Sequence, residues 1–242
     1  MLAKNKLVFL LDVDNTLLDN DRFATDLTER LTKSFGVNEC DRFWVIYSKL
    51  RDQLGYADYL GALEAFSSGL ADRPELRQMS PFLLDYPFEN RLYPRVLEVI
   101  SHLQTLGLPT ILSDGDTIFQ PRKVQRSGLG LAVAGQVMIF VHKELEAASI
   151  QRRYPAEHYV IVDDKPQLLA AMKQVFSARL TTIFVTQGHY AIESLNAEID
   201  PPPDRRIKTI AELMEFSLSD FLVAAPQAVT HDPMERDSKE HV

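Results

Sequence analysis

The pattern of hydrophobic and polar positions divides the chain into three stretches. Residues 7–11 form a short, wholly apolar run, which is typical of a buried strand. From 21 to 93 the apolar residues recur at helical spacing, and no strand is indicated. From 94 onward short apolar runs alternate with amphipathic segments. The pattern predicts an α/β fold in which a doubly wound parallel sheet carries a helical module inserted early in the chain.

The helical module is predicted to contain two long helices and two shorter ones. Phe23, Leu27, Leu31 and Phe35 lie four residues apart, and Gly36 follows where a helix stop is expected. A second helix with the same type of apolar face covers 43–54 and ends at Gly55. Shorter helices are expected over 58–67 and 74–84, so the whole module spans 21–93.

The remaining sequence predicts the strands and covering helices of the sheet. A helix over 94–106 begins at a proline and is followed by Gly107. A further helix is expected over 168–176. The expected strands are short and rich in β-branched or aromatic residues: 109–113, 136–141, 159–163 and 181–185.

The last part of the chain predicts a connector, a closing helix and a tail. Three prolines in 200–204 exclude a central strand or a helix interior there. Thr209 and Glu212 have the spacing of a capping box, so a helix is expected over 209–216. The polar stretch 226–242 predicts a mobile tail. The sheet domain would then comprise 1–20 and 94–225.

Composition narrows the classes of partner. The chain has 242 residues, with 26 Lys and Arg against 34 Asp and Glu, so its formal net charge is −8. Without a dense basic stretch, this balance argues against nucleic-acid binding. Cys40 is the only cysteine, which excludes an intrachain disulfide and a thiolate zinc cluster and favours a reducing cytoplasm. The first apolar run is too short for a signal peptide, and no run reaches the roughly 20 apolar residues of a membrane span. We expect a soluble protein; its oligomeric state is not readable from the sequence.

The candidate chemistry lies where predicted strands end. Asp12 and Asp14 follow the first strand, Ser113 ends the second, and Lys143 comes just after the third. The pair Asp163-Asp164 follows the fourth. The carboxyl ends of parallel strands meet at one edge of the sheet, so these side chains are expected to share one site. Clustered carboxylates repel one another, and a hard divalent cation would offset this repulsion.

These motifs, in this order, resemble those of the haloacid dehalogenase-like hydrolase superfamily over residues 6–216. The resemblance implies a Rossmann-like core, and the insertion at 21–93 resembles the superfamily's helical C1 cap. It implies that Asp12 is the nucleophile and that Asp14 is the general acid and base. Asp12, Asp164 and the backbone carbonyl of Asp14 would bind Mg²⁺, and Asp163 would support this site or bind through water.

The same resemblance implies that Ser113 and Lys143 hold the phosphoryl oxygens. The expected function is a Mg²⁺-dependent phosphatase that hydrolyses a small phosphorylated metabolite through an aspartyl-phosphate. Asp14 favours this over dehalogenation, because a halide leaves without a proton. Phosphomutase or dehalogenase activity within the same superfamily remains an alternative, as does a different class, the non-enzymatic phosphoacceptor or interaction module.

Several residues depart from the superfamily pattern or are secondary candidates. Asp163 stands where many cap-bearing members have glycine. Asp114 stands where asparagine is more common, and Asp116 adds a further carboxylate, so these two residues would suit a partly cationic substrate. His142 and Lys165 are lower-ranked alternatives to Lys143 as the cation. The residues of the helical module considered as able to reach the site are Arg51, Tyr56, Tyr59 and Arg77.

Overall fold

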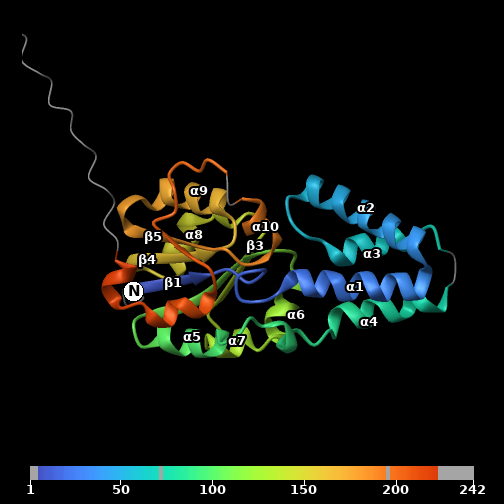
Figure 1. Ribbon diagram of the computed structural model, residues 1–242, viewed down its shortest axis with the longest axis horizontal. Helices are drawn as coiled ribbons and strands as arrows, with labels where there is room; N and C mark the ends of the chain where they lie inside the picture. The colour runs from blue at the N-terminus through green and yellow to red at the C-terminus, as the bar shows by residue number, and fades with distance from the viewer. Residues whose placement is uncertain (1–4, 71–72, 195–196, 223–242) are drawn as a thin grey trace, which may run out of the picture.

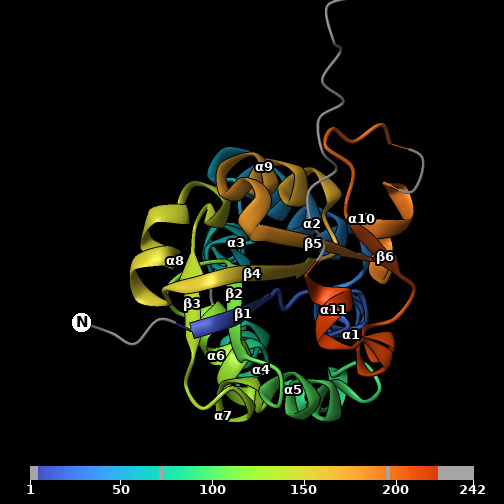
Figure 2. The same ribbon diagram turned by 90° about the vertical axis from the view of Figure 1, so that its left-hand side faces the viewer.

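A parallel β-sheet forms the centre of the molecule. The structure, a computed structural model, describes residues 5–70, 73–194 and 197–222. Within these residues the sheet has six strands in the order β3-β2-β1-β4-β5-β6, all pairing in parallel (Figure 2). The predicted α/β sheet is therefore confirmed. Its strands are β1 (Asn5–Leu11), β2 (Leu108–Asp114), β3 (Val137–Phe140), β4 (Ala156–Asp163), β5 (Leu180–Val185) and β6 (Arg205–Ile207).

Helices cover both faces of the sheet, as the doubly wound prediction requires (Figures 1 and 2). Alternate residues of β1 point to opposite faces, so Phe9 and Leu11 enter one hydrophobic cluster while Val8 and Leu10 enter another. The first cluster packs against α5 (Val96–Gln104), α6 (Phe119–Arg126), α7 (Leu129–Ala132), η5 (Ile210–Glu215) and α11 (Leu218–Phe221). The second packs against α8 (Ala147–Arg153), α9 (Pro166–Phe176) and α10 (Gly188–Glu193).

The segment between β1 and α5 is helical and extends away from the sheet (Figure 1). Phe23, Leu27, Leu31 and Phe35 are all buried, as their spacing predicted. Gly55 ends the second helix with a φ of 79°, a left-handed conformation that glycine adopts without steric cost. The elements here are α1 (Asn20–Phe35), α2 (Val37–Leu54), α3 (Tyr59–Ser67), η1 (Pro74–Gln78), α4 (Met79–Leu84) and η2 (Phe88–Arg91).

The two backbone segments by which the chain enters and leaves this helical segment lie side by side. The amide of Asp19 donates to the carbonyl of Arg91 at 2.7 Å, and the amide of Tyr93 donates to the carbonyl of Leu17 at 3.0 Å. Between them, Leu18 forms an isolated antiparallel bridge with Leu92. Two hydrogen-bonded backbone segments just beyond β1 therefore join the helical segment to the sheet.

Some predicted elements differ in their limits or type. The helix predicted over 94–106 starts only at Val96, because Arg95 adopts a left-handed φ of 67°. The stretch 74–84 begins as the 3₁₀ helix η1 before α4. The capping box of Thr209 and Glu212 is present, but the element it starts is the 3₁₀ helix η5 rather than an α-helix. Strand β6 was not predicted, since three residues at a sheet edge carry no clear periodic signal.

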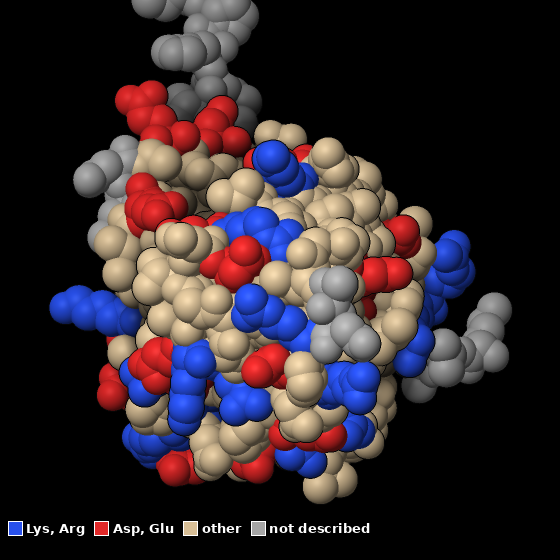
Figure 3. Space-filling model, turned by 90° about the vertical axis from the view of Figure 1, so that its right-hand side faces the viewer, with Lys and Arg blue, Asp and Glu red and all other residues tan. Residues whose placement is uncertain are grey.

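The C-terminal tail, membrane-spanning segments and surface charge were also subjects of prediction from the sequence. The predicted tail 226–242 lies outside the described residues. Among the helices that the structure describes, none is both long and apolar enough to cross a membrane. Positive and negative side chains are interspersed on the face at the end opposite the sheet (Figure 3). That face therefore does not present a single sign of charge.

Candidate active site

The strand order reverses beside β1, and the acidic residues gather at this point. β1 lies between β2 and β4, so the chain passes to one side for β2 and β3 and to the other for β4. Leu11 pairs in register with Val162, and the amide of Asp12 donates to the carbonyl of Val162 at 3.1 Å. This register brings Asp12 beside Asp163. In open α/β sheets, ligands bind at such switch points outside the carboxyl ends of the strands.

Asp12, Asp163 and Asp164 form a buried acidic trio. One carboxylate oxygen from each lies within 4.8 Å of the others. Their exposed fractions are 5%, 0% and 0%, so water screens their mutual repulsion poorly. Three carboxylates in so small a volume require positive charge nearby.

Lys143 supplies part of this charge from the beginning of η3 (Lys143–Leu145), just after β3. Its Nζ lies 2.5 Å from Asp12 Oδ1 and 2.7 Å from Asp163 Oδ2, the second contact being an ion pair rather than a directed hydrogen bond. Burial opposes the ammonium charge, but the carboxylates of Asp12 and Asp163 outweigh it and raise the pKa of Lys143 well above its usual value. Lys143 therefore stays charged between two members of the trio.

Asp164 differs from the other two members of the trio in its hydrogen bonding. Neither of its carboxylate oxygens has a hydrogen-bond partner among the described residues. Asp163, in contrast, accepts the amide of Lys165 at 2.9 Å in addition to the Lys143 ion pair. Burial, followed by the charges of Asp163 and Asp12, raises the pKa of Asp164. A buried carboxylate without partners is costly, so the donor set fits a hard cation bound at Asp164 with Asp12 beside it.

Asp14 and Ser113 lie at the same sheet edge and share a neighbour. The turn after Asp12 requires a left-handed φ of 58° at Asn15, which asparagine tolerates better than most residues. Gln120 Nε2 then lies 3.2 Å from Asp14 Oδ2 and 2.9 Å from Ser113 Oγ. The structure thus places all six candidate residues at one edge and adds Gln120 to them.

Sequence reasoning missed Gln120 and also Lys123, whose Nζ lies 2.7 Å from Asp14 Oδ1. Both belong to α6, the helix that follows Ser113, and they lie three residues apart on its buried face. The signal that could have indicated them was this three-residue spacing of two polar residues on the helix that follows Ser113. Neither residue type marks a site by itself.

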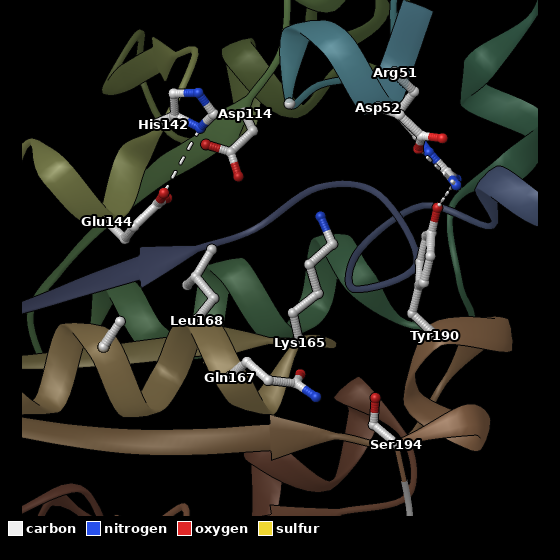
Figure 4. Close-up of a pocket in the computed structure, with 12 residues that line it drawn as sticks. Arg51, Asp52, Asp114, His142, Glu144, Lys165, Gln167, Leu168, Tyr190 and Ser194 are labelled. Atoms are coloured by element: carbon white, nitrogen blue, oxygen red, sulfur yellow. Dashed lines mark hydrogen bonds and ion pairs between the residues drawn. The ribbon is translucent and has the colours of Figure 1, made fainter. Parts of the chain in front are cut away.

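A cavity of about 740 Å³ is lined by Asp114 and by Lys165, the residue that follows Asp164 in the chain (Figure 4). Lys165 points into it from the start of α9, and Asp114, whose Oδ1 accepts the amide of Lys143 at 2.8 Å, faces it from β2. Arg51 of the helical segment donates to the hydroxyl of Tyr190 at 2.6 Å across the opposite side. The lining residues are Arg51, Asp52, Gly55, Asp114, His142, Glu144, Lys165, Gln167, Leu168, Ala171, Tyr190 and Ser194.

The four residues considered in the helical module divide around this cavity. Arg51 lines the cavity. Tyr56 and Arg77 are not among the described residues that line it. Tyr59 is buried and lies 5.3 Å from Phe119 of α6, measured between ring centroids. His142 lies beyond the end of β3, is half exposed and lines the cavity, and its Nδ1 lies 3.6 Å from Glu144 Oε1.

The comparisons with known proteins decide the family. A family model described as haloacid dehalogenase-like hydrolase matches residues 7–175. The chain belongs to this family. It is a hydrolase of the haloacid dehalogenase-like type, as the motifs indicated.

Solved structures agree with this assignment. A protein from Burkholderia xenovorans LB400, described provisionally as a haloacid dehalogenase-like hydrolase, is 47% identical, with a TM-score of 0.83 over 90% of this chain and 99% of that one. The HAD-hydrolase YfnB from Bacillus subtilis is 16% identical, with a TM-score of 0.59 over 88% and 98%. The L-2-haloacid dehalogenase PA0810 is 19% identical, with a TM-score of 0.55 over 88% and 99%. The likeness to the last two shows the fold alone. Comparison with curated proteins finds no match.

Proposed function

We propose that this hydrolase is a Mg²⁺-dependent phosphatase acting on a small phosphorylated metabolite through an aspartyl-phosphate. The observation that carries the proposal is the position of Asp14. Its carboxylate shares Gln120 with Ser113 at the edge where Asp12 lies, so a second carboxylate is available for proton transfer. Dehalogenation requires a nucleophile but no such acid, because a halide leaves without a proton.

In the proposed reaction Asp12 attacks phosphorus and the bond to the ester oxygen breaks, while Asp14 gives that oxygen a proton. In the second step Asp14 takes a proton from water, and the water oxygen bonds to phosphorus. The bond from phosphorus to Asp12 then breaks, its electron pair returns to the carboxylate, and inorganic phosphate leaves. Ser113 and Lys143 hold the phosphoryl oxygens by a hydroxyl hydrogen bond and by charge.

Asp12, Asp164 and the backbone carbonyl of Asp14 would hold Mg²⁺, with Asp163 supporting them. The unpaired oxygens of Asp164 support this assignment and favour Asp164 over Asp163 as a direct ligand. YfnB, which shares the fold, is described as bound to magnesium. When bound, the cation would neutralise charge on the transferring phosphoryl group.

Magnesium binding has a measurable consequence for stability. A ligand that binds only the folded state stabilises it, by about 2.7 kcal/mol at a concentration one hundred times its dissociation constant. We expect Mg²⁺ to raise the melting temperature of the wild type and to have little effect on Asp164→Asn. An Asp163→Asn variant that abolishes the shift while Asp164→Asn preserves it would reverse the assignment of the two aspartates.

The helical segment 21–93 would act as the C1 cap over a core of 1–20 and 94–225. The cavity between Arg51 on α2 and Lys165 on the core is then the substrate site. Its lining includes acidic and basic side chains, among them Asp114, which suits a small polar phosphoester carrying further polar groups. A cytoplasmic location is consistent with the single cysteine, Cys40, which is free.

The proposed activity can be separated from its rivals with one panel of substrates. We expect the wild type to release phosphate from small phosphoesters with Mg²⁺ and to lose this activity with EDTA. For alkyl phosphates, Asp14→Asn should lower kcat by about 10²-fold to 10⁴-fold, the usual contribution of general acid and base catalysis. Release of halide from 2-haloalkanoates without phosphate release would identify a dehalogenase. Isomerised sugar phosphates would identify a mutase.

A further inference from the structure

Lys123 is a buried lysine that the proposed reaction does not yet use. Only 1% of this residue is exposed. Its Nζ lies 2.7 Å from Asp14 Oδ1 and 3.0 Å from Asn20 Oδ1. Burying an ammonium is costly unless its partners are well placed, so the position of this group is closely determined by its surroundings.

Four aromatic rings surround the Lys123 ammonium. Their centroids lie 5.3 to 5.9 Å from Nζ, within the range of cation–π attraction. The rings come from both parts of the molecule, since three belong to α1, α3 and η2 and one belongs to α6 itself. They are Phe23, Tyr59, Phe88 and Phe119.

Gln120 holds the other oxygen of the same carboxylate. It lies on α6 near Lys123, and only 3% of it is exposed. Its Nε2 contacts Asp14 Oδ2 at 3.2 Å, while Lys123 contacts Oδ1. With one donor on each oxygen, the Asp14 carboxylate is held in a defined rotation. The second contact of Gln120, to Ser113 Oγ at 2.9 Å, fixes that rotation relative to the phosphoryl site.

We infer that Lys123 and Gln120 are positioning residues that orient the Asp14 carboxylate for proton transfer. Contacts at the interface between the helical segment and the core hold Lys123 in place. The inference rests on the proposed phosphatase function and adds to it the residues that orient its acid and base. The link to the helical segment continues from Lys123 through Asn20, whose Nδ2 lies 3.5 Å from the hydroxyl of Tyr59 on α3. Misplacing a catalytic group by about 1 Å can cost 10²-fold in rate.

A second buried lysine provides a matched control. Lys173 on α9 is 9% exposed and pairs with Asp204 at 2.7 Å, and it also donates to the carbonyl of Leu180. The change Lys173→Met therefore removes a buried ion pair by the same substitution as Lys123→Met, but at a position where no contact to Asp14 is made. Any general effect of losing such a pair appears in both variants.

The experiment uses p-nitrophenyl phosphate with Mg²⁺ in rapid-mixing and steady-state assays. Because p-nitrophenolate leaves without a proton, Asp12 can still be phosphorylated when Asp14 is misaimed. Breakdown of the aspartyl-phosphate needs Asp14 to take a proton from water and becomes slow. We expect Lys123→Met to show a burst near one p-nitrophenol per enzyme and a kcat about 10²-fold lower, with kcat/KM within about threefold of wild type. Lys173→Met should keep the wild-type kcat.

With an alkyl phosphate as substrate, the same variants should show a different relation between the changes in kcat and in kcat/KM. There the leaving oxygen needs a proton from Asp14, so both kcat and kcat/KM should fall in Lys123→Met. Gln120→Met, which keeps side-chain length but removes the donor, should repeat both patterns and decides the matter if Lys123→Met does not fold. A purely structural role of Lys123 would lower the burst amplitude with the folded fraction and would not separate the two substrates.

Three results would overturn the inference. A folded Lys123→Met with wild-type kcat on both esters would remove it while leaving the phosphatase function intact. The same kinetic split in Lys173→Met would assign the effect to the loss of a buried ion pair in general. A wild type that releases no phosphate from any ester would overturn the proposed function, and the inference with it.

Discussion

Asp12→Asn is expected to lower kcat for phosphate release by at least about 10⁴-fold. The amide lacks the anionic oxygen that would bond to phosphorus, so the covalent step loses its nucleophile. Asp12 is 5% exposed, and Lys143 Nζ holds its Oδ1 at 2.5 Å, so bulk water has little access to replace it as a nucleophile. Phosphate release from the best ester of the panel measures the loss.

The fold of Asp12→Asn should survive, which separates loss of chemistry from loss of structure. Lys143 retains its ion pair with Asp163, and asparagine has almost the same shape as aspartate. Thermal unfolding checks this point, and the exposed Asp41 on α2 provides a control as Asp41→Asn with wild-type activity. Acid-quenched wild type should carry covalent phosphate by mass spectrometry, and Asp12→Asn should not. Covalent phosphate on a folded Asp12→Asn would show that another residue is the nucleophile.

The sheet edge could be predicted because it depends on local signals. Each strand that carries a candidate residue is a short apolar run, and parallel strands place their carboxyl ends together whatever helices connect them. This is why Asp12, Ser113 and Lys143 could be expected at one edge from their positions alone. The position of Asp163 and Asp164 after a strand could not distinguish the two, and only the family resemblance favoured Asp164 as the metal ligand, because the difference between them lies in their partners. Asp163 meets Lys143, while Asp164 meets no donor among the described residues.

The contacts around Asp14 could not be predicted, because they depend on packing between distant segments. Lys123 lies 109 residues from Asp14, and its position requires rings from α1, α3 and η2 as well as α6. A lysine followed by valine on an amphipathic helix is most often a solvated residue, and only the assembled interface buries it. The cavity is a similar case, since Arg51 and Tyr190 meet across it from segments 139 residues apart.

Lys143→Met is expected to lower the free energy of unfolding by about 3–5 kcal/mol, the cost of leaving buried charges without their partner. Lys143 is fully buried, and its ammonium contacts both Asp12 and Asp163, so its loss leaves the acidic trio without this positive charge. Urea unfolding without divalent cations measures the effect. Lys173→Met should cost less, because it leaves only Asp204 without its lysine, and Asp204 Oδ2 still accepts the amide of Thr182 at 2.8 Å.

A double variant tests whether repulsion within the trio causes this loss. Adding Asp12→Asn to Lys143→Met removes one of the repelling carboxylates, so the double variant should be more stable than Lys143→Met alone. Mg²⁺ should also restore part of the stability of Lys143→Met, because a cation near Asp12 and Asp164 opposes the same repulsion. If both additions instead leave the stability of Lys143→Met unchanged, lost packing of the lysine side chain explains its cost. The balance of charge between Lys143 and the trio would then not be what stabilises this edge of the sheet.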